Sequence, residues 1–114
     1  MPQADYPVYF AWYNEVDNLA ANGNICLRRG QLDAALAWFE RALTHAAAPA
    51  WAAYGAAQAA ARLEQPDLAL TYLRQALARG YPATRAALEA DSHLHGLHDR
   101  PGWRTCLEQL PPIA

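Results

Sequence analysis

The sequence predicts an all-α fold built from repeated helical hairpins. Its central segment, Leu32–Leu43, returns later in the chain as Pro66–Leu77, with the matching Ala-Leu pairs 34 positions apart. A repeat of this length is typical of stacked pairs of helices. Alanine is the commonest residue, and it favours helix while letting neighbouring helices approach closely. The period, the composition and the helical spacing of the apolar residues therefore indicate the same fold class.

A chain of 114 residues is long enough for one continuous core but not for two independent ones. We therefore expect a single domain with four parts. These are an aromatic N-terminal helix, two hairpins and a C-terminal cap, over residues 1–15, 16–49, 50–83 and 84–114.

The N-terminal part, over residues 5–15, is rich in aromatic side chains. A helix is expected here, with Asp5 as its cap and Pro7 in its first turn, and it should continue into the first hairpin. The aromatic residues exceed what a core of two hairpins needs; they are Tyr6, Tyr9, Phe10, Trp12 and Tyr13. They are expected either to cover the first hairpin or to form an interface, as in a homodimer.

Glycines and prolines mark the ends of the expected helices. Gly30 and Gly80 suit the left-handed turn that follows a helix. Pro66 suits the first turn of the last hairpin helix, and Pro49 separates the two hairpins. The inward-facing residues of the first hairpin are expected to be Leu19, Asn22, Gly23, Cys26, Leu32, Ala35, Phe39 and Ala42.

The first helix of the second hairpin fits two registers. Taking Gly55 as the inward glycine that matches Gly23 would turn Trp51 and Tyr54 toward the core. An ungapped shift of 34 positions instead places both aromatics on an outer stripe. We prefer the ungapped register, because the other one needs a two-residue insertion. The ungapped register buries Ala53, Ala56, Ala57 and Ala60.

After Gly80 the pattern changes, and the remaining chain is expected to cover the end of the hairpin stack as a polar-faced cap. A short helix is predicted over residues 82–90, and a compact connecting segment over residues 91–98. Asp99 is expected to cap a last helix, which stops at Pro111 and runs through Trp103, Cys106, Leu107 and Leu110.

Over about residues 16–110 the chain resembles bacterial tetratricopeptide-repeat proteins. In the repeats the resemblance rests on Gly23, Ala35, Phe39, Ala42 and Pro49, and then on Ala57, Ala69, Leu73 and Ala76. The tail looks like the terminal cap of many such proteins, through Gly80, Tyr81, Leu88, Asp91, Leu94, Leu97, Pro101, Trp103, Cys106 and Leu107. The resemblance implies a short right-handed solenoid and a non-enzymatic module, such as a small chaperone or adaptor, that binds another protein or a peptide.

In tetratricopeptide hairpins the first helix of each pair lines a concave groove. The matching positions here are Asp17, Ala20, Asn24 and Arg28, and then Trp51, Tyr54, Gln58 and Arg62. Trp, Tyr and Arg are enriched at binding hot spots. We therefore expect a peptide to contact Asn24, Arg28, Trp51, Tyr54, Gln58 and Arg62. Burial in the core is the alternative for the two aromatics. Ala20 stands where the chaperone-type carboxylate clamp has a lysine, so that kind of clamp is not expected.

A histidine cluster near the C-terminus supports an alternative hypothesis, a metal-binding protein. His93, His95 and His98, with Cys106, are residue types that ligate transition metals. Their spacing matches no standard zinc pattern, and solvated histidines are the competing interpretation. No cofactor is expected.

Other function classes have little support. The net charge of −2 gives no basic surface for nucleic acid. Ser92 is the only serine, and neither a G-x-S-x-G elbow nor a glycine-rich phosphate loop occurs, so no enzyme is expected. No apolar run reaches the roughly 18–20 residues that span a bilayer, and no signal peptide is recognised. We expect a cytoplasmic protein in which Cys26 and Cys106 are free, buried thiols.

Overall fold

The computed structural model describes residues 7–9 and 15–110 of the chain. This part contains six α-helices and one 3-10 helix. In chain order they are α1 (Glu15–Arg28), α2 (Leu32–Leu43), α3 (Ala50–Arg62), α4 (Pro66–Ala78), α5 (Arg85–Ala90), the 3-10 helix η2 (Ser92–Leu97) and α6 (Pro101–Glu108).

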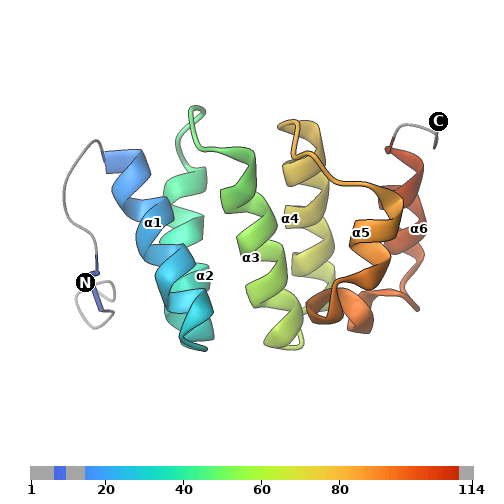
Figure 1. The fold of residues 1–114 in the computed structure, drawn as a ribbon, viewed down its shortest axis with the longest axis horizontal. Coiled ribbons are helices and arrows are strands. Elements are labelled where there is room, and N and C mark those ends of the chain that lie inside the picture. The colour runs from blue at the N-terminus through green and yellow to red at the C-terminus, as the bar shows by residue number, and fades with distance from the viewer. Residues whose placement is uncertain (1–6, 10–14, 111–114) are drawn as a thin grey trace.

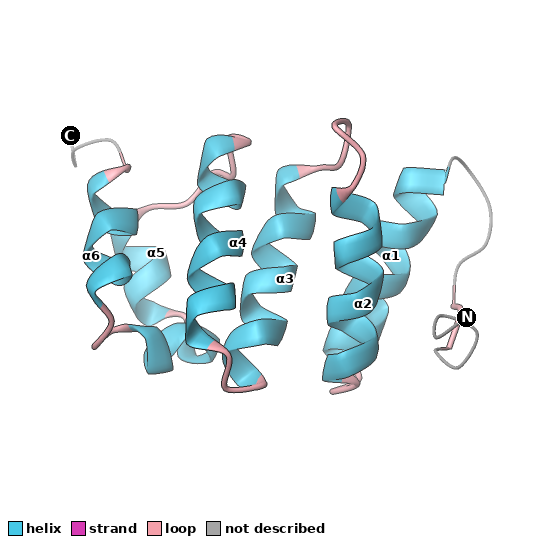
Figure 2. Ribbon diagram, turned by 180° about the vertical axis from the view of Figure 1, so that it is seen from behind, coloured by secondary structure: helices cyan, strands magenta, loops and turns pink. Residues whose placement is uncertain are grey.

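Neighbouring helices pack antiparallel and form two layers. Helices α1, α3 and α5 lie in one layer, and α2, α4 and α6 lie behind them (Figures 1 and 2). The molecule measures 42 × 26 × 19 Å, and α1 and α6 lie at opposite ends of the long axis (Figure 1). The predicted all-α class is confirmed. Over residues 7–9 and 15–110, no helix is long and apolar enough to span a membrane.

The ring of Phe39 on α2 joins three helices. It is fully buried, and two glycines pack closely against it. A Cβ added to Gly23 of α1 would lie 2.7 Å from Phe39 Cδ1, and one added to Gly55 of α3 would lie 2.5 Å from Phe39 Cζ. Glycine at these two positions therefore lets both α1 and α3 approach the ring closely.

The alanine face predicted for α3 is buried. The four alanines predicted to face inward are fully buried: Ala53, Ala56, Ala57 and Ala60. Gly55 is also buried, but it contacts Phe39 of the preceding hairpin. Gly23 and Gly55 are thus both packed against the ring of Phe39.

The predicted helix-ending glycines are confirmed. Gly30 and Gly80 have φ angles of 77° and 92°, in the left-handed region. After Gly30, the N–H of Gln31 bonds back to the carbonyl of Cys26 at 2.9 Å, which satisfies a carbonyl at the end of α1. Glu64, 34 positions after Gly30, adopts the same backbone conformation with φ 61°. The two hairpin turns therefore share one geometry.

The predicted N-terminal helix is wrong over residues 7–9, which lie outside any helix. The Trp38 indole N–H donates to the carbonyl of Pro7 at 3.0 Å, and the backbone N–H of Tyr9 donates to Asn22 Oδ1. These bonds direct the backbone toward the first hairpin instead of into a helix. Residues 1–6 and 10–14, and with them most of the predicted aromatic cluster, lie outside the described residues.

The C-terminal tail follows the prediction in outline. Thr84 caps α5 by accepting a 3.0 Å hydrogen bond from the N–H of Ala87. Asp99, in contrast, does not cap α6, because Arg100 occupies the cap position ahead of Pro101 and makes no side-chain cap bond. The tail packs against the hairpins through buried side chains of Leu88, Leu94, Leu97, Trp103, Cys106 and Leu107.

Replacing Gly55 by alanine is expected to destabilise the protein by about 1–3 kcal/mol, the usual cost of overfilling a packed core. The better helix propensity of alanine, about 1 kcal/mol, offsets only part of this cost. Urea denaturation followed by circular dichroism measures the change. Gly96→Ala is the matched control, because nothing lies within 4 Å of the Cβ that it adds. Equal stability of the two variants would contradict the tight contact with Phe39.

Candidate protein-interaction face

The predicted groove residues lie on α1 and α3, which are neighbours in the front layer (Figure 1). We call this surface the α1–α3 face; its candidate residues are Asn24, Arg28, Trp51, Tyr54, Gln58 and Arg62. Trp51 is 43% exposed, Arg28 and Arg62 are exposed, and Asn24 is half-buried. Ala20, predicted to share this stripe, is fully buried and offers no contact surface.

Tyr54 and Gln58 are engaged by the tail of the same chain. The Tyr54 hydroxyl donates to Asp91 Oδ2 at 2.5 Å, and Gln58 Nε2 donates to the same oxygen at 2.8 Å. The Tyr54 ring stacks on Tyr81, with ring centroids 4.3 Å apart and planes inclined by 8°. The other carboxylate oxygen of Asp91 accepts from the N–H of His93 at 2.9 Å. The face is therefore divided into a covered part and an open part around Trp51.

The surroundings of Asp91 keep it ionised. Burial alone would raise its pKa, but the hydrogen bonds from Tyr54, Gln58 and the backbone of His93 outweigh burial and lower the pKa below its ordinary value. Burial, and then the bond to Asp91, raise the pKa of Tyr54, so its hydroxyl remains a donor. Burial and Asp91 also raise the pKa of Tyr81. The link is thus a charge-assisted hydrogen bond at neutral pH.

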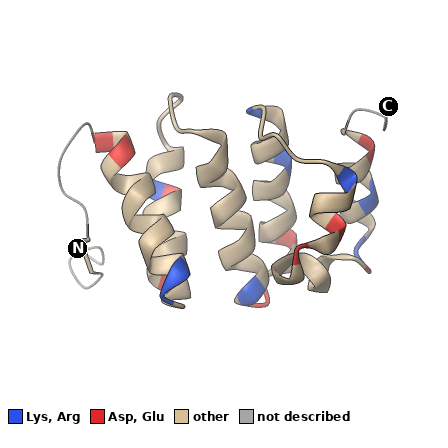
Figure 3. Ribbon diagram, viewed as in Figure 1, with Lys and Arg blue, Asp and Glu red and all other residues tan. Residues whose placement is uncertain are grey.

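Arginines gather where α1 and α3 end. Arg28 is the last residue of α1 and Arg62 the last residue of α3, and Figure 3 shows basic residues at these ends of both helices. Glu15 and Asp17 lie in the first turn of α1, at the opposite end. A cation at a helix C-terminus is favourable by about 0.3–1 kcal/mol. Because both guanidinium groups remain exposed, they can also pair with an incoming anion.

The candidate metal ligands are brought together only in part: the rings of His95 and His98 lie side by side, with centroids 5.1 Å apart. Cys106 is fully buried, and burial raises the pKa of its thiol, whereas His93, His95 and His98 are exposed. The His98 ring packs on Trp103 with centroids 4.5 Å apart. Over residues 7–9 and 15–110, no group of three or more His, Cys, Asp or Glu side chains is arranged to hold a metal ion.

The predicted state of the cysteines is confirmed. Cys26 and Cys106 are both free and buried. Burial raises the pKa of the Cys26 thiol as well, and the nearby Arg29 opposes this only in part. Thiols of this kind are poor nucleophiles.

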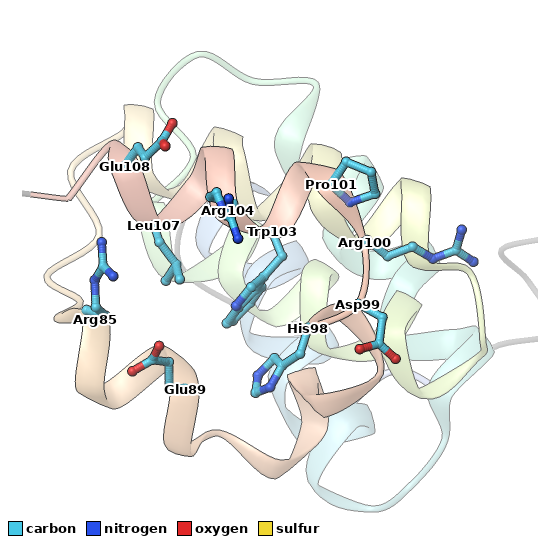
Figure 4. A pocket seen from close by; sticks show the side chains of 10 residues that line it. All are labelled: Arg85, Glu89, His98, Asp99, Arg100, Pro101, Trp103, Arg104, Leu107 and Glu108. Atoms are coloured by element: carbon cyan, nitrogen blue, oxygen red, sulfur yellow. The ribbon is translucent and has the colours of Figure 1, made fainter.

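A cleft of about 790 Å³ between α5 and α6 was missed by sequence reasoning (Figure 4). Trp103 and Leu107 line it, and charged side chains surround them: Arg85, Glu89, Asp99, Arg100, Arg104 and Glu108. Three arginines and three carboxylates balance one another, so the cleft has no preferred ligand charge. The cleft depends on how the tail packs, and no local sequence pattern indicates it.

Comparisons with protein-family models, with curated proteins and with solved structures found no match.

Asp91→Asn is expected to lower the free energy of unfolding at pH 7, because the carboxylate accepts at both oxygens, from Tyr54 and Gln58 and from the N–H of His93, whereas the amide has one acceptor oxygen and no charge. The folded-state pKa of Asp91 lies below 3.8, so wild-type protein keeps this contribution above about pH 4 and loses it as the pH falls through the folded pKa. The stability difference between the two proteins should therefore narrow below about pH 4.

Urea denaturation between pH 7 and pH 3 measures this difference. Asp99→Asn is the control, since Asp99 is an exposed aspartate of the same tail. A difference that is zero at pH 7, or that is the same at every pH, would show that the carboxylate does not hold the tail.

Proposed function

We propose that the chain is a non-enzymatic protein-interaction module of the tetratricopeptide type, a short right-handed solenoid that holds a peptide or a helix of another protein on its α1–α3 face. Burial of matching positions 34 residues apart supports the repeat; the pairs are Ala35 and Ala69, Phe39 and Leu73, and Ala42 and Ala76. The shared turn geometry of Gly30 and Glu64 supports it too.

The exposure of Trp51 is the observation that carries the proposal. The opposite side of α3 consists of fully buried alanines, whereas its largest side chain is left 43% exposed. Solvent exposure of a tryptophan forgoes much of the roughly 1.5–3 kcal/mol available from burying a large apolar side chain. A partner that covers Trp51 recovers this free energy, and tryptophan is one of the residue types enriched at hot spots.

The arginines of the α1–α3 face orient the bound partner segment. Within residues 7–9 and 15–110, no hydrogen bond or ion pair engages the side chains of Arg28 and Arg62. Both lie at the same edge of the face, beyond Trp51 along the helices (Figure 3). A partner segment with an apolar residue for Trp51 and acidic residues for this edge fits the surface best. A small adaptor or chaperone would need little more than such a face.

Trp51→Ala and Arg62→Ala are each expected to weaken partner binding by at least about tenfold, as hot-spot truncations do. Affinity capture from the native organism, with mass spectrometry, identifies the partner, and titration with the purified partner measures the change. Arg104→Ala, an exposed arginine of α6, is the matched control. Circular dichroism checks that every variant is folded. Unchanged binding by both face variants would exclude this face.

A structural homo-oligomer is the second candidate, because Val8 and Tyr9 are 58% and 38% exposed at the N-terminal end. Exposed apolar side chains that cluster together often mark an interface. If the candidate is right, sedimentation equilibrium should show a dimer that dissociates in the Val8→Asp variant. If the protein stays monomeric at all concentrations up to about 10⁻³ M, the free energy of dimerisation is weaker than about 4 kcal/mol. That result would exclude the homo-oligomer.

A further inference from the structure

A pocket of about 430 Å³ lies between the N-terminal residues 7–9 and the last turn of α1. We call it the strap pocket; it is lined by Tyr9, Ile25, Arg28 and Arg29. It is a shallow depression that is open to solvent, suited to one side chain of a larger ligand rather than to an enclosed small molecule. Arg28 belongs both to this pocket and to the α1–α3 face, so a ligand in the pocket can continue onto the face.

Tyr9 forms a fixed wall of the strap pocket. Its backbone N–H donates to the buried side chain of Asn22, and its hydroxyl donates to Gln31 Oε1 at 3.0 Å. The guanidinium carbon of Arg29 lies 4.9 Å from the centre of the Tyr9 ring, a cation–π contact. Two residues earlier, Pro7 is held by the indole of Trp38. The wall is therefore in place before any ligand arrives.

The charge of the strap pocket is one-sided among the described residues. Two arginines and no carboxylate of residues 7–9 and 15–110 line it, in contrast to the balanced cleft between α5 and α6. The acidic residues of α1, Glu15 and Asp17, lie in its first turn. They are about 15 Å or more from Arg28 along the helix axis. Together the arginines favour an anion, and the apolar surfaces of Tyr9 and Ile25 favour an apolar group next to it.

We infer that the strap pocket binds an acidic side chain, flanked by an apolar one, of a partner peptide. The inference rests on the proposed function, and it specifies that one end of the bound peptide carries an acidic residue next to an apolar one. Arg28, whose guanidinium has no partner in the described part of the chain, pairs with the carboxylate in two parallel hydrogen bonds. Arg29 keeps its face on Tyr9 and donates from its edge. The apolar neighbour packs on Ile25 and the Tyr9 ring.

The probe is the peptide acetyl-Gly-Leu-Glu-Leu-Gly-amide, titrated into ¹⁵N-labelled full-length protein. The expected result is saturable shifts of the amide signals of Ile25, Arg28 and Arg29, with a Kd of about 10⁻³ M, as befits so small a contact. The analogue with Gln in place of Glu should bind at least about tenfold more weakly, because it lacks the charge-assisted bonds.

Variants locate the contact. Arg28→Gln and Ile25→Ala should each lower the affinity for the Glu peptide by about tenfold. Arg104→Gln, the same substitution on α6, should leave the affinity unchanged. Equal affinity for the Glu and Gln peptides, absence of binding, or insensitivity to Arg28→Gln would overturn the inference. Octanoate is the further probe: if it binds as tightly as the peptide, the pocket takes a free fatty acid and the inference also fails.

The two proposals fail separately. Shifts that map to Trp51, with no preference for Glu over Gln, overturn the strap pocket but agree with a peptide on the α1–α3 face. Loss of partner binding in Arg28→Gln with no loss in Trp51→Ala supports the strap pocket and excludes the rest of the face.

Discussion

The packing of one phenylalanine between two glycines is the constraint on which the rest of the structure depends. Phe39 meets Gly23 of its own hairpin and Gly55 of the next, so a single ring sets how closely three helices approach. That spacing determines which side of α3 is covered by α1 and α2. The side left over carries Trp51, and its exposure thus follows from the packing on the opposite side of the helix.

Much of the fold was predictable because its determinants are local. Helix periodicity, Gly30, Gly80 and the alanines of α3 act within a few residues or within one hairpin, and all were confirmed. The path of residues 7–9 was predicted wrongly, because Pro7 is held by Trp38, 31 positions away. Composition and local propensity cannot indicate a partner at that distance.

The candidate site was predicted only in part for the same reason. The stripe on α3 follows from periodicity, and so does the exposed position of Trp51. Sequence alone could not show that Tyr54 and Gln58 meet Asp91, because that contact requires the tail to fold back over α3. Nor could it indicate the strap pocket, whose wall is a residue predicted to be helical.

The bond between Tyr54 and Asp91 spans 37 positions and has a kinetic consequence. The contacts within α1–α2 and within α3–α4 join neighbouring segments, and contacts of low sequence separation form rapidly. The tail can pack only after Tyr54, Gln58 and the stacked ring of Tyr81 have come together to form the surface that it contacts. We therefore expect the two hairpins to assemble first and the tail to pack onto α3 afterwards, so that Tyr54 and Gln58 are uncovered during folding.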